Sequence, residues 1–464
     1  MSQLNRQARR VRTMVEEMAA LINAGDPRWR KVLAKAQQQA AEITDPYSAD
    51  DATSRLALVA HHERLLAGDF DGARAWLHRA LAAIGRQRGR SDEQQRLDDH
   101  EWTVHLNLCQ LEQLTGDWEA AHASARTAVE LAPATVNPDK SHRHSLVTLA
   151  ALDLARQRFP EAIAGYQQAV ELFRAAEPSE LGVVLLGLAQ AQMQSGALAA
   201  AEGNLDRAEP LLAGNPEGLA GLQQARAFIA MVSRSPGAAE EMRAFAAQVG
   251  EGTEFNPIHR QQARQADAHA EHVDGDPVEA KQRFDRVVAR ARAEGDPVGL
   301  ADALIRSSAA TQDLALVTTD PETATGLHRA ALAQATEARE IIAARERPLK
   351  LASIDVALAD YVGQWHQVVD GISLPVLRAA LTRADAAAAE LRAAALRGDT
   401  AAARRDFAAL HAGHGFEVAC DLAFRLGDKE TLARLINDRA AGYDWRAARV
   451  TGEQHDTGRE PSTV

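Results

Sequence analysis

The chain has 464 residues, a formal net charge of −12 and a sequence pI of about 5.8. A single core stops growing below this length, so we expect several folding units or one elongated repeat array. The acidic balance argues against nucleic acid as a partner, because nucleic-acid-binding domains usually present a basic surface. Aromatic residues make up 4% of the chain and Ala fills segments such as 378–403, which favours helices over strands.

Cysteine usage and hydropathy predict a cytoplasmic protein. Cys109 and Cys420 lie far apart without CxxC spacing, which fits a reducing compartment. The amphipathic, Arg-bearing N-terminus lacks the apolar core of a signal peptide. The longest charge-free stretch, residues 181–201, is interrupted by three glutamines and is too polar to span a membrane. We therefore expect a soluble chain that has no membrane partner.

The chain begins with a predicted helical cap over residues 1–48. Asp45-Pro46 and the polar run 48–51 indicate a linker after it. Beyond this linker we expect a repeat array over 49–345, C-terminal helical hairpins over 346–449 and a disordered polar tail over 450–464.

A recurring Gly-Asp pair predicts where helices end and begin. Glycine adopts the left-handed conformation that ends a helix, and aspartate accepts hydrogen bonds from the free N–H groups of the next one. Ser235-Pro236 and Asp320-Pro321 are variants, and Asp276 to Glu279 has the spacing of a capping box. The pairs predict repeated helix–turn–helix hairpins and lie at 25–26, 68–69, 116–117, 275–276, 295–296, 398–399 and 427–428.

The second helix of each hairpin carries a small–large–small stripe. Spacings of four and three residues put its three members on one helical face, and small ends let neighbouring helices approach closely. The first four stripes are Ala73, Leu77 and Ala80; Ala121, Ala125 and Ala128; Ala162, Tyr166 and Ala169; and Ala201, Leu205 and Ala208. The same phase continues less regularly at Ala239, Ala280, Ala324 and Ala403.

These turns and stripes resemble the tetratricopeptide repeats, best over residues 54–212 and at fewer positions over 213–345 and 398–442. The resemblance implies an all-α fold, a right-handed α-α superhelix built as a solenoid of antiparallel helix hairpins. Ala73, Ala121, Ala162 and Ala201 are 48, 41 and 39 residues apart (121 − 73, 162 − 121, 201 − 162). The usual repeat is about 34 residues, so these units have longer helices or loops. Segment 416–442 is a further predicted hairpin and resembles regions that accompany bacterial CHAT peptidases.

In tetratricopeptide arrays the first helices line a concave groove that receives extended peptides. The resemblance therefore implies a polar lining whose amides can pair with a peptide backbone. By repeat phase this lining comprises Arg55, His62, Gln110, Gln113, His144, Gln190, Gln194, Gln262, Gln265, His269 and His272. The Lys and Asn clamp of chaperone-binding members is missing, because only Asn107 matches it, so chaperone tails are not the expected partner.

No P-loop, GxSxG elbow, HExxH or kinase signature occurs in the chain. Glu101, His105 and Cys109 share one helical stripe and could bind zinc, but their repeat phase favours packing. His411 and His414 form a possible metal pair, although a helix C-terminus is the preferred interpretation. We therefore predict no catalytic residue, no metal and no cofactor.

Three functional hypotheses follow. The first is a non-catalytic scaffold or adaptor that binds a peptide or protein partner in a concave helical groove. The second is a regulatory or sensor subunit for a separate effector, for example a CHAT-type peptidase. The third is a metal-dependent helical enzyme that uses Glu101 and His105, or His411 and His414. The sequence specifies neither the partner nor the oligomeric state.

Overall fold

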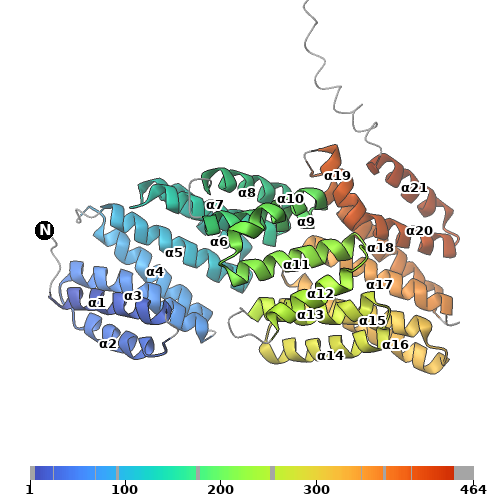
Figure 1. The fold of residues 1–464 in the computed structure, drawn as a ribbon, viewed down its shortest axis with the longest axis horizontal. Coiled ribbons are helices and arrows are strands. Elements are labelled where there is room, and N and C mark those ends of the chain that lie inside the picture. The colour runs from blue at the N-terminus through green and yellow to red at the C-terminus, as the bar shows by residue number, and fades with distance from the viewer. Residues whose placement is uncertain are drawn as a thin grey trace, which may run out of the picture. The chain divides into compact units, whose positions relative to one another are not determined.

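The computed structural model describes residues 6–23, 26–67, 69–89, 94–173, 178–250, 257–345, 347–368, 372–398 and 400–443, and every regular element in these ranges is helical. The tail expected to be disordered at 450–464 lies outside the described residues. The chain divides into two compact units (Figure 1). Unit 1 comprises Met1–Ala155 and Gly165–Leu172, and unit 2 comprises Arg156–Ala164 and Phe173–Val464.

The helices follow one another as successive antiparallel neighbours. Unit 1 contains α1 (Arg6–Asn23), α2 (Trp29–Ala41), α3 (Pro46–Leu66), α4 (Phe70–Gln87), α5 (Gln94–Thr115), α6 (Trp118–Leu131), η1 (Ala132–Ala134) and α7 (Pro138–Ala155), and α8 (Phe159–Phe173) is shared between the units. Unit 2 continues with α9 (Pro178–Gln194), α10 (Leu198–Ala208), η2 (Glu209–Leu212), α11 (Pro216–Val232), α12 (Ala238–Val249), α13 (Pro257–Val273), α14 (Pro277–Glu294), α15 (Pro297–Val317), α16 (Pro321–Ala343), α17 (Pro348–Val368), α18 (Leu374–Ala395), α19 (Ala401–Phe407), η3 (Ala408–Ala412), α20 (Gly413–Arg425) and α21 (Lys429–Tyr443).

The Gly-Asp turns are confirmed at most positions. Gly116 and Gly275 have φ of 82° and 85°, a region that glycine occupies at little cost. Asp117 then accepts a hydrogen bond from the Ala120 N–H at 3.2 Å and starts α6. Asp276 accepts one from the Glu279 N–H at 2.9 Å and starts α14. Each turn therefore ends one helix and caps the next.

Other predicted caps differ in detail. Gly237 rather than Ser235 precedes α12, and Thr400 caps α19, while Asp399 lies outside the described residues. The capping box at Asp276 is only half formed, because the Glu279 carboxylate pairs with Arg283 at 2.8 Å instead of reaching back. A cap can thus be satisfied by a neighbouring residue that has equivalent chemistry.

The linker predicted at residues 45–51 is wrong. Asp45 accepts a hydrogen bond from the Ser48 N–H at 2.8 Å, so the Asp-Pro step opens α3. The carboxylates that suggested a linker are instead buried beside arginines. Asp50 pairs with Arg86 at 2.6 Å, and Asp51 pairs with Arg55 at 3.1 Å.

The small–large–small stripes form the cores between hairpins. All three members of the stripes in α4, α6 and α10 are fully buried, and Tyr166 in α8 is 5% exposed. Polar pairs also join the two helices of a hairpin. Glu112 accepts from the Ser124 hydroxyl at 2.8 Å, and Gln192 accepts from the Asn204 amide at 2.8 Å. Both pairs are twelve residues apart, so equivalent positions of two repeats carry the same link.

Within unit 2 the last helices return to the first ones (Figure 1). His411 of η3 lies 2.7 Å from the Gln194 carbonyl of α9 through Nε2, and the Phe407 ring lies 6.1 Å from Phe159. Gly196 is needed here, because a Cβ would lie 2.5 Å from the Asp406 carbonyl oxygen. The array of unit 2 therefore closes on itself over more than two hundred residues.

Candidate binding site in unit 2

The inner-face residues predicted in unit 1 are largely engaged locally. The Arg55 guanidinium is buried and pairs with Asp51 at 3.1 Å. The half-buried His62 ring lies 6.0 Å from Trp29 of α2. Gln113 donates to the Cys109 sulfur at 3.2 Å. Gln110 is exposed and His144 is half-buried. These contacts describe packing within and between neighbouring helices rather than one common hollow.

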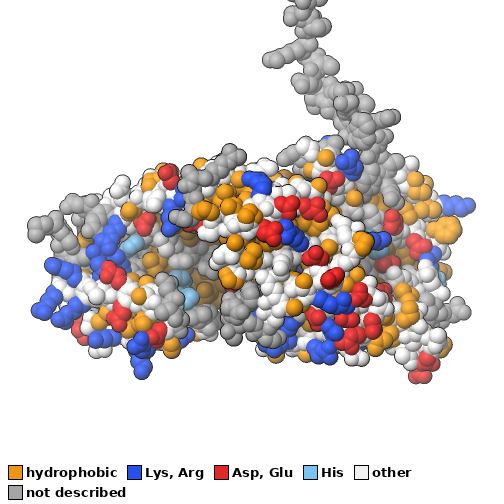
Figure 2. Space-filling view, viewed as in Figure 1, with side chains coloured by type: hydrophobic (Ala, Val, Ile, Leu, Met, Phe, Trp, Pro, Cys, Tyr) orange, Lys and Arg blue, Asp and Glu red, His pale blue; other side chains and the backbone are white. Residues whose placement is uncertain are grey.

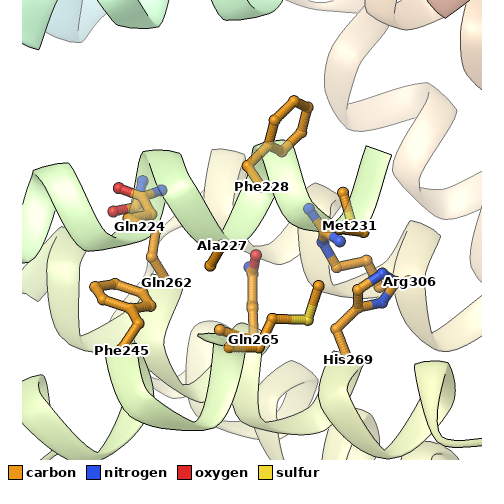
Figure 3. A pocket seen from close by; sticks show the side chains of 11 residues that line it. Gln224, Ala227, Phe228, Met231, Phe245, Gln262, Gln265, His269 and Arg306 are labelled. Carbon is orange, nitrogen blue, oxygen red and sulfur yellow. The ribbon is translucent and has the colours of Figure 1, made fainter. Parts of the chain in front are cut away.

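Three of the predicted residues of α13 lie together around a hollow in unit 2 (Figure 3). Gln262, Gln265 and His269 share it with residues of α11, α12 and α15. Of the remaining predicted residues in unit 2, Gln190 and Gln194 are half-buried on α9, and His272 pairs with Asp313 at 2.6 Å.

The hollow is small and open to solvent. Its volume is about 80 Å³. One water needs roughly 10–15 Å³ on this measure, so the space holds several waters or one small functional group of a larger ligand. We refer to it as the α13 pocket and define it by Gln224, Ala227, Phe228, Met231, Met242, Phe245, Gln262, Gln265, Ala266, His269 and Arg306.

One side of the α13 pocket is apolar. Ala227 and Met242 are each 3% exposed, and Phe245 is fully buried. Phe228 and Met231 continue the wall along α11 and are only partly buried. Such a wall can cover an aliphatic or aromatic group, and methionine adapts readily to different shapes. Small alanines on α11 and α13 leave the space that larger side chains would fill.

The polar side of the pocket carries groups that lack a partner within the described residues. The Gln262 Oε1 and His269 Nδ1 atoms are buried and accept or donate no hydrogen bond there. The one hydrogen bond of the Gln265 side chain to another described residue runs from its amide to the Gly299 carbonyl at 3.4 Å. A buried polar atom without a partner costs free energy, so these atoms favour a ligand that can pair with them.

Arg306 of α15 brings a positive charge to the same place. Its side chain lies beside His269 and Met231 at one end of the pocket (Figure 3). Burial lowers the pKa of Arg306, and no acidic group offsets that effect. Within the described residues no carboxylate pairs with this guanidinium, whereas most arginines nearby are ion-paired. The guanidinium therefore brings a positive charge to the pocket that no described carboxylate pairs with.

His269 has a pKa that is lowered by its burial and by the charge of Arg306. Burial is the main cause that lowers its pKa to about 3, and the charges of Arg306 and His272 lower it further. The imidazole is therefore neutral near pH 7, so its ring can offer hydrogen bonds without a second positive charge. The ring also contacts Phe284 edge-on, at 6.3 Å between centroids.

Sequence reasoning missed Arg306, Gln224 and the apolar wall. Arg306 could have been found by extending the spacing between equivalent repeat positions to the next repeat. His272 hydrogen-bonds Asp313, which lies 41 residues later. The same interval added to Gln265 reaches Arg306. The wall residues of α12 belong to second helices, which the inner-face assignment did not consider.

Four of the candidate metal ligands make other contacts, whereas the His105 Nδ1 atom has no hydrogen-bond partner among the described residues. Glu101 pairs with Arg88, and Cys109 is fully buried and accepts from Gln113. His411 binds a carbonyl, and His414 lies 3.4 Å from Asp360. Among the residues that the structure describes, no three His, Cys, Asp or Glu side chains gather as a metal site. The helix end predicted at His411 to Glu417 is wrong, because a π-helical turn carries the chain into α20.

A second hollow in unit 2 is rich in arginine. Arg243, Arg264, Arg283, Arg286 and Arg290 line it above an alanine floor between α12, α13 and α14. Each of these arginines pairs with a carboxylate, as Arg283 does with Asp267 at 2.7 Å. Figure 2 shows basic and acidic side chains intermingled over α12–α15. The charges there largely neutralise one another.

The fold defines the class of protein: the described residues form an all-α array of tetratricopeptide-like helix hairpins. No known family matches in a scan of its sequence, and no curated protein matches either. No described helix has the length and apolar character needed to cross a membrane.

Solved structures with a similar fold include several repeat proteins. A Rap protein complexed with competence and sporulation factor is 11% identical, with a TM-score of 0.49, over 87% of this chain and 98% of that one. The human IFIT1 dimer with PPP-AAAA is 13% identical, with a TM-score of 0.45, over 97% and 96%. A tetratricopeptide repeat protein from Parabacteroides merdae is 15% identical, with a TM-score of 0.32, over 67% and 98%.

Proposed function

We propose that the chain is a non-catalytic binding protein that receives a segment of a partner protein or peptide in the α13 pocket. The observation that carries this proposal is the joint presence of an apolar wall and unpaired polar atoms in one hollow. Ala227, Met242 and Phe245 form the wall, and Gln262 and His269 supply the polar atoms. Binding sites combine apolar surface with a few polar groups in this way.

The closed array of unit 2 supports this role. Contacts such as that of His411 with Gln194 hold the first and last helices of the unit together. A closed array needs little rearrangement to keep α11, α13 and α15 in place. Preorganisation of this kind lowers the entropy cost of binding.

Site-specific photo-crosslinking tests the proposal. Benzoylphenylalanine replaces Phe228, which lines the pocket, and in a control it replaces Phe424, which is 74% exposed on α20. Both positions are aromatic in the natural chain, so the probe disturbs each of them little. We expect one defined peptide to be captured in cells at Phe228 and not at Phe424, with mass spectrometry identifying it.

A pocket-filling variant completes the test. Gln224→Trp places a large side chain on the half-buried rim of the pocket and should abolish crosslinking at Phe228. Equal capture at both positions, or capture that survives Gln224→Trp, would refute the proposal. The captured sequence also decides whether the partner is an effector such as a CHAT-type peptidase. Crosslinking to nucleic acid instead would contradict the expected protein partner.

A further inference from the structure

We infer that Arg306 anchors a carboxylate in the α13 pocket, and that the ligand carries an apolar group next to that carboxylate. This inference rests on the proposed function and names the chemistry of the ligand. Its basis is a half-buried guanidinium that lines the pocket between α11, α13 and α15 and has no acidic partner among the described residues. A partly desolvated charge without a partner is unfavourable, and a bound anion offsets that cost.

The single charge favours a carboxylate over a phosphate. A guanidinium binds a carboxylate through two parallel hydrogen bonds, and the two charges balance. A phosphate monoester carries about −1.5 to −2 charges at neutral pH, which one arginine beside a neutral His269 does not balance. The other polar side chains in the pocket, Gln224, Gln262 and Gln265, are uncharged amides.

The other residues of the pocket indicate which groups of the ligand lie next to its carboxylate. Met231 lies beside Arg306, and Ala227 and Phe245 continue the apolar wall away from it (Figure 3). The side-chain amides of Gln224 and Gln262, which line the pocket, can accept an N–H from the ligand. A peptide C-terminus with an apolar last residue offers all three features, and so does an acidic side chain flanked by apolar residues.

This site differs from the lysine and asparagine clamp that the sequence lacks. Arg306 belongs to α15, a first helix later in the array than those compared for the clamp, and no lysine lines the pocket. The anchor here is one guanidinium surrounded by amides and apolar groups.

Methionine methyl groups offer a direct readout. The chain has six methionines, and Met231 and Met242 both line the pocket. The full-length protein is labelled with ¹³C at the methionine methyls and titrated with four probes. These are N-acetyl-L-leucine, N-acetyl-L-leucinamide, the α-amide of N-acetyl-L-glutamic acid, and inorganic phosphate.

We expect a carboxylate probe to shift the Met231 and Met242 signals and the uncharged leucinamide to leave them in place. Tighter binding of N-acetyl-L-leucine assigns the site to a peptide C-terminus, and tighter binding of the glutamate amide assigns it to an acidic side chain. Arg306→Gln should weaken carboxylate binding roughly tenfold or more, because it removes a charge-assisted bidentate contact. Arg306→Lys should have an affinity for the carboxylate between those of the natural protein and Arg306→Gln, because lysine keeps the charge but cannot form two parallel hydrogen bonds.

The matched control is Arg226→Gln. Arg226 lies on α11 at the surface and pairs with Asp206 and Glu209 at 2.9 Å, so its loss should leave the titration unchanged. Circular dichroism confirms that each variant is folded. Equal shifts from the acid and the amide, shifts from phosphate alone, or full affinity in Arg306→Gln would overturn the inference. If crosslinking at Phe228 persists but the pocket does not prefer carboxylate probes, the proposed function stands and only this inference fails. If crosslinking and carboxylate binding are both absent, the proposed function fails as well.

Discussion

Arg306 differs from most arginines that the structure describes in unit 2. Surface arginines of unit 2 such as Arg243 and Arg339 pair with carboxylates, and these pairs raise their pKa. Arg306 has only the opposing effect of burial, which lowers its pKa. Proteins retain such unfavourable groups where binding requires them. We therefore expect that removing the charge at this position raises stability and weakens ligand binding.

We predict that Arg306→Met stabilises the protein while it removes carboxylate binding. Methionine fills a similar volume and needs no partner, so the free energy of unfolding should rise by about 1–3 kcal/mol. Urea denaturation of the full chain measures it, and Arg226→Met serves as the surface control with a change within about 0.5–1 kcal/mol. A marked loss of stability in Arg306→Met would show that the guanidinium supports the fold instead.

At the scale of the helices, the small–large–small stripe sets how closely hairpins approach. Ala121 and Ala123 test this on one helix, because Ala121 is fully buried and Ala123 faces solvent. Ala121→Leu should destabilise the protein by about 1–3 kcal/mol through overpacking, whereas Ala123→Leu should change it by no more than about 0.5 kcal/mol. Thermal unfolding followed by circular dichroism compares the two. Equal melting temperatures would mean that the stripe does not govern packing.

Local signals explain why the hairpins were predictable. Gly116 and Asp117 determine their turn within a few residues, and the stripe of Ala121, Ala125 and Ala128 lies on one helix. The contact between Gln194 and His411 was not predictable, because it joins segments 217 residues apart and has no local pattern. The helix end predicted near Gly413, where the structure has a π-helical turn, was wrong for a related reason. Glycines there suggest a helix end, but Gly415 packs closely against Val356 and Ala388 of other helices.

The candidate site was predictable in part for the same physical reason. Repeat phase identified Gln262, Gln265 and His269 because inner positions recur along first helices. Phase alone cannot show which of these positions surround a hollow. That depends on the alanines opposite them and on Phe245 from a second helix, so only the packed structure reveals it.

Across the whole molecule, buried histidines make stability depend on pH. Burial is the main cause that lowers the pKa of these side chains, which occur in both units: His61, His100, His105, His259, His269, His328 and His411. His414 acts in the opposite direction, because its contact with Asp360 raises its pKa. The lowered set outnumbers it, so in mildly acidic solution these histidines together bind fewer protons in the folded chain than in the unfolded chain.

His100 in unit 1 and His269 in unit 2 allow a quantitative prediction. Burial and nearby positive charge, chiefly Arg55 for His100 and Arg306 for His269, lower their pKa to about 4 and about 3 from the ordinary 6.5. The unfolded chain takes up a proton at each site below pH 6.5, and the folded chain does so only near the lowered pKa. Stability is therefore complete above pH 6.5 and falls as the pH drops, by about 2 kcal/mol per histidine between pH 7 and pH 5.

Urea denaturation at pH 7, 6 and 5 measures this loss. His100→Gln and His269→Gln should each flatten the pH dependence by about 2 kcal/mol, because glutamine does not titrate. Since the two residues lie in different units, tryptophan fluorescence from Trp102 in unit 1 and Trp365 in unit 2 can follow each separately in single-tryptophan variants. A carboxylate bound beside Arg306 favours protonation of His269, so N-acetyl-L-leucine should reduce the acid sensitivity of unit 2 and leave that of unit 1 unchanged. If neither substitution changes how the free energy of unfolding depends on pH, the protons are taken up at other groups.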